Sequence, residues 1–319
     1  MTLKSLPLLA GLVLAGVASA GAPDANHVAK NAKWVVHVDF DRFRNTQVAE
    51  AVFEHVVDDR AAARIEAFKN LFQLDPRTDF HAMTAYGVDK EEDHAVLILY
   101  SDYDEDALLA LLRSGDQYQH ASYKGVDLHR FENENARADG QRVGKLGWVC
   151  FPAGDTMVFG HELARLHAAI DVIQDRSPDL AAGGDSSLWK MVPEKSAFFA
   201  AAADLDGLGD QLNQHAAILR QTDAIALVLD ENDGTFSAAL LVNAASDQAA
   251  LQVSQILTGF VAMANLSVEE DPDKAWIADL TRNLRVDQVG RKVQVSVSCP
   301  AADVAGVVRR ETAAKQAVQ

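Results

Sequence analysis

The stretch HAMTAYGVDKEEDHAVLILYSDYDEDALLAL, residues 81–111, decides the fold, because a second stretch repeats its pattern without a gap. That second stretch is DAIALVLDENDGTFSAALLVNAASDQAALQV, residues 223–253. Each one has the pattern of an apolar strand, an acidic turn, a second apolar strand, a polar cap and a helix. The shared order predicts an internal repeat in which each copy is one α+β unit.

Both copies extend outward in the same way. Each is preceded by a strand that ends in an Asp-x-Asp pair, VDFDRF at 38–43 and ADLDGL at 203–208, and then by helix formers, which in the first copy run over 47–72. Two strands and a last helix follow. The consensus β-α-β-β-α-β-β-α predicts an α+β fold with mostly antiparallel sheets. The strand YKGVDLHRF, 123–131, is expected only in the first copy.

The repeat also predicts the domain organisation. AVLILY, 95–100, and AALLV, 238–242, offer apolar side chains to both faces of their sheets, so both faces need a cover. Helices of one unit cover one face, and we therefore expect the two units to pack as a pseudo-symmetric pair. The expected segments are a signal peptide at 1–20, a first repeat at 33–175, a linker at 176–193 and a second repeat at 194–316.

Turn residues differ between the copies. Asp233-Gly234 between apolar runs predicts a tight hairpin turn in which both residues adopt positive φ. Glu91-Glu92 stands at the equivalent place and suits such a turn poorly, so we expect a wider loop there. A turn at these two residues would place His94 opposite Asp89.

Helix caps are expected at equivalent places as well. Asp104 and Ser246 precede the aligned helices and are good N-cap residues. Asp41 and Asp206, the second acids of the two Asp-x-Asp pairs, are expected to cap the helices that follow them.

The N-terminus has the features of a secretory signal peptide. Lys4 precedes the apolar run Leu6–Val17, and Ala18-Ser19-Ala20 has the small-x-small pattern of a cleavage site. The run is shorter than the roughly 20 residues that a spanning helix needs. We expect cleavage between Ala20 and Gly21, no membrane anchor, and a soluble mature protein in the periplasm or outside the cell.

Composition excludes one class of partner. The chain has 46 acidic and 29 basic side chains and a net charge of −17. Nucleic acids and anionic lipids attract basic surfaces, so we expect no nucleic-acid binding. Apolar residues make up 49% of the chain, which is enough to form real hydrophobic cores.

The pattern resembles a class of uncharacterised exported bacterial α+β proteins with two diverged repeats. The resemblance rests on VDFDRF, on ADLDGL, and on the stretch that connects the two repeats, VFG…AIDVIQDRSPDL…SSLWKMVPEKSAFFAAAADLDGL. The resemblance implies a fold type and export. It implies no activity, cofactor or catalytic residue.

Histidine is the main candidate for a metal-binding or acid–base residue. Nine of the ten histidines lie between His27 and His167, and only His215 lies in the second copy. His37 alternates with Asp39 and Asp41 on one strand face, a set with the donor types of a metal or acid–base site. The competing interpretation is a solvent-facing polar edge or a cap cluster, which the repetition of the Asp-x-Asp pair favours.

Cysteine usage leaves two alternatives open. Cys150 and Cys299 both lie in runs with the pattern of strands. An oxidising compartment permits one disulfide between them. Two buried free thiols are the alternative, because cysteine packs well as a small hydrophobic residue.

Three functions remain in competition. The favoured one is a non-catalytic exported protein that binds a protein or small-ligand partner, or a second copy of itself. The others are a metal-dependent or hydrolytic enzyme with a site in the first repeat, and a carrier of small apolar ligands. The chain has no G-x-S-x-G, P-loop, G-x-G-x-x-G or Cys-x-x-Cys motif, so no cofactor is expected and the catalytic residues of an enzyme are unknown.

Overall fold

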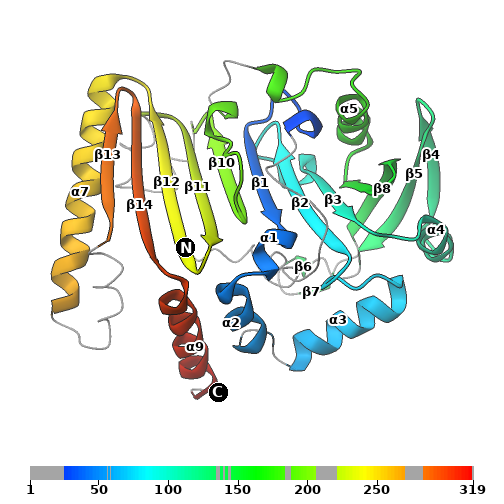
Figure 1. Ribbon diagram of the computed structural model, residues 1–319. Coiled ribbons are helices and arrows are strands. Elements are labelled where there is room, and N and C mark those ends of the chain that lie inside the picture. The colour runs from blue at the N-terminus through cyan, green and yellow to red at the C-terminus, as the bar shows by residue number, and fades with distance from the viewer. Residues whose placement is uncertain are drawn as a thin grey trace. The chain divides into compact units, whose positions relative to one another are not determined.

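Apolar runs of the chain form strands and the helix formers between them form helices, so the fold is α+β, as predicted (Figure 1). All strand pairs with a described register are antiparallel. The structure, a computed structural model, describes residues 25–55, 57, 59–133, 137–138, 141–142, 145–183, 188–205, 221–269 and 283–317.

Two compact units divide the chain. Unit 1 takes the described residues within 25–32, 39–41 and 58–184. Unit 2 takes those within 33–38, 42–57 and 185–319. Each unit is therefore assembled from more than one stretch of the sequence.

Unit 1 has strands in the order β2-β3-β9-β8-β5-β4. Their bounds are β2 Phe80–Gly87, β3 Val96–Ser101, β4 Gln119–Tyr123, β5 Val126–Asn133, β8 Lys145–Ala153 and β9 Thr156–Gly160, and β6 Arg137–Ala138 pairs with β7 Gln141–Arg142. The helices are α3 Asp59–Phe72, α4 Glu105–Arg113 and α5 Leu163–Ile173, with short 3-10 turns η1 Ala25–His27, η2 Glu92–His94 and η3 Ala181–Gly183.

Unit 2 has strands in the order β13-β14-β12-β11-β10-β1. Their bounds are β1 Trp34–Asp39, β10 Phe198–Ala203, β11 Thr222–Asn232, β12 Thr235–Ala244, β13 Arg285–Val289 and β14 Lys292–Pro300. The helices are α2 Gln47–His55, α7 Asp247–Glu269 and α9 Ala301–Ala317, with a 3-10 turn η4 at Trp189–Met191. The short helix α1, Phe40–Arg44, crosses the division between the units.

The two aligned stretches form the same elements. Residues 81–111 supply β2, β3 and α4, and residues 223–253 supply β11, β12 and the start of α7. The strand order is also the same, because β2-β3-β9-β8 in unit 1 corresponds to β11-β12-β14-β13 in unit 2.

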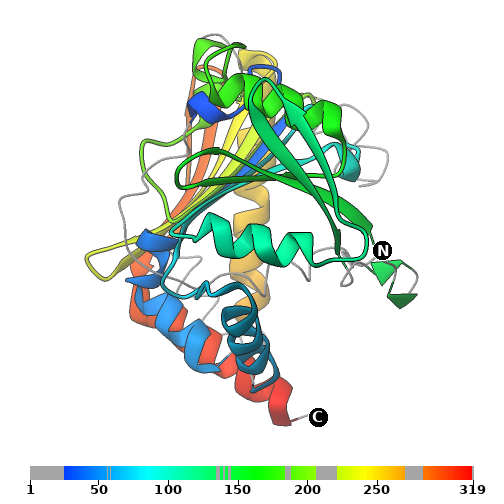
Figure 2. The same ribbon diagram turned by 90° about the vertical axis from the view of Figure 1, so that its right-hand side faces the viewer.

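The compact units differ from the expected repeat boundaries at 33–175 and 194–316. Residues 33–38 and 42–57, expected in the first repeat, belong to unit 2. The reason lies in long-range contacts: β1 pairs with β10, and α2 lies against α9 (Figures 1 and 2).

The predicted turns and the predicted caps at Asp104 and Ser246 are confirmed. Asp233 and Gly234 have φ of 48° and 72°. The loop between β2 and β3 is wider and contains η2. The Ala107 amide donates to Asp104 Oδ1 at 3.0 Å, and the Ala249 amide donates to Ser246 Oγ at 3.1 Å.

One expected strand is a hairpin instead. The run 123–131 contains the turn between β4 and β5 rather than a single strand. Lys124 and Gly125 form this turn with φ of 49° and 87°. Gly125 adopts this positive φ without the backbone strain that a residue with a side chain would have, which explains why the chain reverses there.

The helical region 47–72 also differs from the expectation. It forms two helices, α2 and α3, in place of one. Asp41 does not precede a helix, because α1 already begins at Phe40 and Asp41 lies in its first turn. The other expected cap, Asp206, lies outside the described residues.

A row of fully buried residues marks the core of unit 1. Neighbouring strands place Thr84, Ile98, Val158, Cys150 and Leu128 side by side, and each is 0% exposed. Helix α5 covers this face of the sheet, since a Cβ atom at Gly160 of β9 would lie 3.3 Å from Leu166.

One hydrophobic core cluster of unit 2 lies between β12, β14 and α7. Its buried residues are Val242, Ala244, Ala249, Ala250, Val253 and Val293. On the other face of β14, Gln294 and Ser298 are exposed, because successive side chains of a strand point to opposite faces.

Candidate functional site

The predicted residues His37 and Asp39 are buried on β1. They are 1% and 2% exposed, and His37 lies opposite Phe199 of β10. The expectation of a solvent-facing edge is therefore wrong for both side chains. Within the described ranges, no group of three or more His, Cys, Asp or Glu side chains is placed to hold a metal ion. His37, Asp39 and Asp41 thus do not form the metal site that their alternation suggested.

Asp41 instead meets a histidine from another strand. His81 Nδ1 lies 3.4 Å from Asp41 Oδ1, and His81 Nε2 lies 3.3 Å from Asp102 Oδ2. The imidazole therefore stands between two carboxylates. We call Asp41, His81 and Asp102 the His81 cluster.

Local structure explains this arrangement. The pairing of β2 with β3 shifts register between Phe80 and Ala82, so His81 occupies an irregular position at the start of β2. Asp102 follows the last residue of β3, and its amide donates to the carbonyl of Asp79 at 2.8 Å. The cluster thus joins the ends of two strands to the first turn of α1.

Exposure limits the chemistry of the cluster. The side chains of His81 and Asp41 are 7% and 11% exposed, whereas that of Asp102 is 77% exposed. An imidazole between carboxylates has the groups for proton transfer. A molecule in solvent reaches Asp102 far more readily than the His81 ring. This exposure favours a structural role for the cluster over proton transfer to a substrate.

A second cluster was not predicted as a site. His94 Nδ1 lies 2.8 Å from Asp89 Oδ2, and His94 Nε2 lies 3.3 Å from Glu162 Oε1. The contact with Asp89 forms within the β2–β3 loop and not by the predicted opposition across a hairpin, because the pairing of the two strands ends at Tyr86↔Val96. Arg165 of α5 completes the group, because its NH2 atom lies 3.0 Å from Asp89 Oδ2. We call these four residues the His94 cluster.

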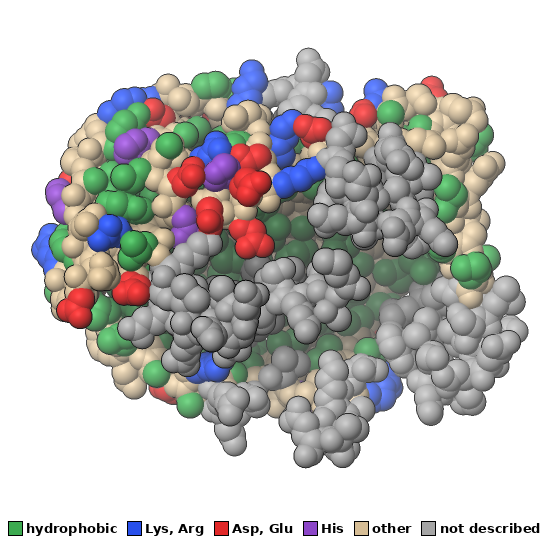
Figure 3. Space-filling model, turned by 180° about the vertical axis from the view of Figure 1, so that it is seen from behind, with side chains coloured by type: hydrophobic (Ala, Val, Ile, Leu, Met, Phe, Trp, Pro, Cys, Tyr) green, Lys and Arg blue, Asp and Glu red, His purple; other side chains and the backbone are tan. Residues whose placement is uncertain are grey.

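Electrostatics follow from this geometry. The hydrogen bond to Asp89 raises the pKa of His94, and the negative charge of Glu162 adds to that effect. The same hydrogen bond lowers the pKa of Asp89. The cluster holds the β2–β3 loop against the start of α5. A space-filling view of the protein shows histidine side chains beside acidic and basic ones on the surface (Figure 3).

The other histidines of unit 1 also contact identified groups. His27 Nδ1 lies 2.8 Å from the Tyr100 hydroxyl, and the His167 ring stacks on Tyr123 with centroids 3.9 Å apart. His120, His129 and His161 contact Asp127, Tyr118 and the Leu146 carbonyl respectively. The concentration of histidine in the first copy therefore reflects several separate contacts and not one shared centre.

Both cysteines are free, so the disulfide alternative is not formed in the structure. Cys150 is 0% exposed in unit 1, and Cys299 is 6% exposed in unit 2. Burial raises the pKa of Cys150 to about 12 and also raises the pKa of Cys299. The two residues fit the alternative of buried thiols that pack as small hydrophobic residues.

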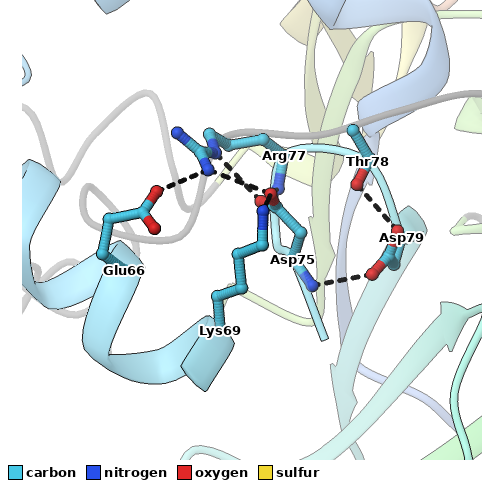
Figure 4. Close-up of polar contacts among 6 residues, drawn as sticks. All are labelled: Glu66, Lys69, Asp75, Arg77, Thr78 and Asp79. Atoms are coloured by element: carbon cyan, nitrogen blue, oxygen red, sulfur yellow. Dashed lines mark hydrogen bonds and ion pairs between the residues drawn. The ribbon is translucent and has the colours of Figure 1, made fainter. Parts of the chain in front are cut away.

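A third polar cluster holds the loop after α3 (Figure 4). The carboxylate of Asp75 accepts from Lys69 Nζ at 2.8 Å and from Arg77 Nε at 2.9 Å. Arg77 NH2 also donates to Glu66 at 2.6 Å, and Asp79 accepts from the Asp75 amide at 2.7 Å. Arg77 and then Lys69 lower the pKa of Asp75 far below its ordinary value against the opposing effect of burial.

Helix α7 presents an uncharged, partly apolar surface that the sequence analysis did not single out. Its sequence has no charged residue between Asp247 and Glu269. Ile256, Phe260 and Met263, spaced i, i+4 and i+7, are 40%, 41% and 61% exposed. We call these three residues the α7 stripe.

The length of α7 does not make it a membrane-spanning segment. No helix among the described residues is both long and apolar enough to cross a membrane.

Comparisons with known proteins show only a weak resemblance. No family model matches this chain, and no curated protein matches it. Crystal form III of TP0453 is 10% identical with a TM-score of 0.48, over 92% of this chain and 100% of that chain. Crystal form I of TP0453 is 9% identical with a TM-score of 0.46, over 91% of this chain and 98% of that chain.

Proposed function

We propose that this protein is an exported, non-catalytic binding protein that docks a protein partner through the α7 stripe. The observation that carries the proposal is the exposure of Ile256, Phe260 and Met263 on a helix that has no charged residue between its terminal acids. Exposed apolar surfaces commonly mark interaction sites.

The charges of the chain favour a protein surface over a lipid surface. Helices that bind in the membrane interface carry Lys and Arg on their polar face. Between its terminal acids α7 has polar residues such as Gln252, Gln255 and Thr258 but no basic one, and the whole chain has a charge of −17. An uncharged stripe of this kind fits an apolar groove on a partner protein.

Site-specific photo-crosslinking tests the proposal in the producing cells. A benzophenone amino acid at Ile256 or Met263 should give one discrete protein adduct. The same group at Gln255, an exposed neighbour on another side of the helix, is the matched control and should give none. Ile256→Lys should abolish the adduct formed from position 263.

Two outcomes contradict the proposal. Equal adducts from positions 255 and 256 indicate random collision. Binding of the purified protein to vesicles of phosphatidylethanolamine and phosphatidylglycerol, lost in Ile256→Lys, indicates that the stripe recognises lipid.

Export and repetition belong to the same proposal. Residues 1–20, which lie outside the described residues, are proposed to act as a signal peptide removed between Ala20 and Gly21. The equal strand order of the two units supports an origin by duplication. Mass spectrometry of the exported protein should show Gly21 as the first residue, and a form that retains Leu6–Val17 would contradict export by cleavage.

The His81 cluster supports a second candidate function, acid–base chemistry in unit 1. The observation in its favour is the placement of one imidazole between Asp41 and Asp102. His81→Gln would then abolish a hydrolytic activity while leaving the folded state intact. Under the structural interpretation, the same change lowers the free energy of unfolding and removes no activity. The carrier of small apolar ligands remains a prediction.

A further inference from the structure

Strand β4 ends the strand order of unit 1 and is an edge strand among the described strands (Figure 1). It pairs with β5 in an unbroken register from Gln119↔Arg130 to Tyr123↔Val126. Its other side therefore offers backbone N–H and C=O groups for pairing with a further strand.

Edge strands usually carry features that prevent such pairing. Charged residues, proline and bulges are the common ones. The sequence of β4, Gln-His-Ala-Ser-Tyr, has no Lys, Arg, Asp, Glu or Pro, and its pairing with β5 has no bulge. Gln119, His120 and Ser122 are exposed.

The edge strand of unit 2 is protected by comparison. The sequence of β13 is Arg-Val-Asp-Gln-Val, with Asp287 at its centre. Two antiparallel copies of β13 would place the two Asp287 carboxylates opposite each other, which is unfavourable. The protein thus has one edge that opposes self-pairing and one that does not.

We infer that β4 is a homodimer interface, at which two copies of the chain pair antiparallel about Ala121 to extend the sheet of unit 1. In this register Ala121 faces Ala121, His120 faces Ser122 and Gln119 faces Tyr123. No like charges oppose each other in any of these pairs, and the small side chains lie at the centre.

Charges at the ends of the strand select the second copy as the occupant. Asp116 precedes β4 and Lys124 follows it. Lys124 and Arg176 both bind Asp171, so this end of the strand keeps one net positive charge. Antiparallel pairing brings the acidic end of one copy toward the basic end of the other, so the ends attract. The side chain of Tyr123 is already held by its hydrogen bond to Asp171 at 2.9 Å and by the His167 ring, which gives the interface a rigid end.

The net charge of −17 sets the salt dependence of this dimer. Two acidic copies repel each other at long range, and salt screens that repulsion. The dimer fraction should therefore rise with ionic strength. The inference does not rest on docking at the α7 stripe, because its tests measure self-association of the purified protein alone.

Cysteine crosslinking of the mature protein tests the interface. In Ala121→Cys the two new thiols face each other across an antiparallel pair, at a Cα separation that suits a disulfide. Mild oxidation should give a covalent dimer. Gln288→Cys, exposed on β13, is the matched control and should stay monomeric, because the natural thiols Cys150 and Cys299 are buried.

A second variant tests the interface without a crosslink. Ser122→Lys adds a charge to the edge of β4 and should eliminate the dimer in sedimentation velocity, whereas Gln288→Lys should leave it unchanged. A wild type that is monomeric at every concentration and salt level overturns the inference. So does a dimer that resists Ser122→Lys, equal crosslinking of both cysteine variants, or growth into filaments, which indicates a pairing that does not close.

Discussion

His94 and Asp89 form a hydrogen-bonded pair with 2.8 Å between Nδ1 and Oδ2. The pKa of His94 is raised above its ordinary 6.5, chiefly by this bond. A histidine with a raised pKa in the folded state stabilises the fold fully below 6.5, and this contribution is lost as pH rises through the folded pKa. We expect stability to fall over that range, measured by urea denaturation at a series of pH values.

Two variants separate the effects of Asp89 and Arg165 on the pKa of His94. In an NMR titration of the His94 ring, Asp89→Asn should lower the pKa of His94. Arg165→Gln should raise it, because the positive charge of Arg165 opposes protonation of the ring. A pKa of His94 that is the same in both variants contradicts the described cluster.

Asp75 supplies a second prediction, at acid pH. Its carboxylate accepts hydrogen bonds from Lys69 and Arg77, and the residue is 8% exposed. Asp75→Asn should lower the free energy of unfolding by about 1–3 kcal/mol near neutral pH, because it leaves charged donors without their partner. Asp233→Asn, exposed in the β11–β12 turn, is the matched control and should change it by no more than about 0.5 kcal/mol.

The stabilisation by the Asp75 carboxylate should decrease in acid. The pKa of Asp75 is lowered from 3.8, so its stabilisation is present above that pH and is lost as pH falls through the folded pKa. The difference between wild type and Asp75→Asn should shrink in strong acid. A constant difference at all pH values would show that the amide disturbs packing and not charge.

Local signals in the sequence predicted much of the fold. Asp233-Gly234, Asp104 and Ser246 each act within a few residues, and each behaves as predicted. The turn at Lys124-Gly125 was missed because lysine seldom adopts positive φ and only Gly125 marks the reversal. The place of β1 in unit 2 depends on its pairing with β10, more than 150 residues away, and no local signal encodes it.

The clusters were harder to predict than the fold. The contact of His94 with Asp89 joins two residues of one loop that are five positions apart, and a sequence can suggest such a local contact. Arg165 comes from α5, 71 residues beyond His94, and only the packing of α5 brings it close. The contact of His81 with Asp41 depends on an irregularity in the pairing of β2 and β3. No residue type in the sequence predicts that irregularity.

Gly125 allows a clean test of backbone conformation in the β4–β5 turn. Its φ is 87°, and an added Cβ atom would meet nothing within 4 Å. Gly125→Ala should therefore lower the free energy of unfolding by about 1 kcal/mol through backbone strain alone. Gly154→Ala in the β8–β9 turn is the control, because it is equally open without a left-handed φ, and it should be neutral or slightly stabilising.

The discontinuous composition of unit 2 leads to a prediction about fragments. Residues 190–319 contain most of unit 2 but lack β1 and α2. In the whole chain β1 pairs with β10 from Trp34↔Ala202 to Val38↔Phe198. Arg42 also binds Asp230, with NH2 at 2.6 Å from Oδ2.

Without these contacts the fragment leaves the edge of β10 unpaired and the partner face of α9 uncovered. We expect residues 190–319 alone to show no cooperative unfolding transition by circular dichroism. Adding a synthetic peptide of residues 33–57 should restore the transition, because it supplies β1, Arg42 and α2 together. A peptide of residues 47–57 supplies α2 alone and should not restore it. If the fragment by itself unfolds cooperatively at the temperature of the whole chain, then β1 and α2 are not integral parts of unit 2.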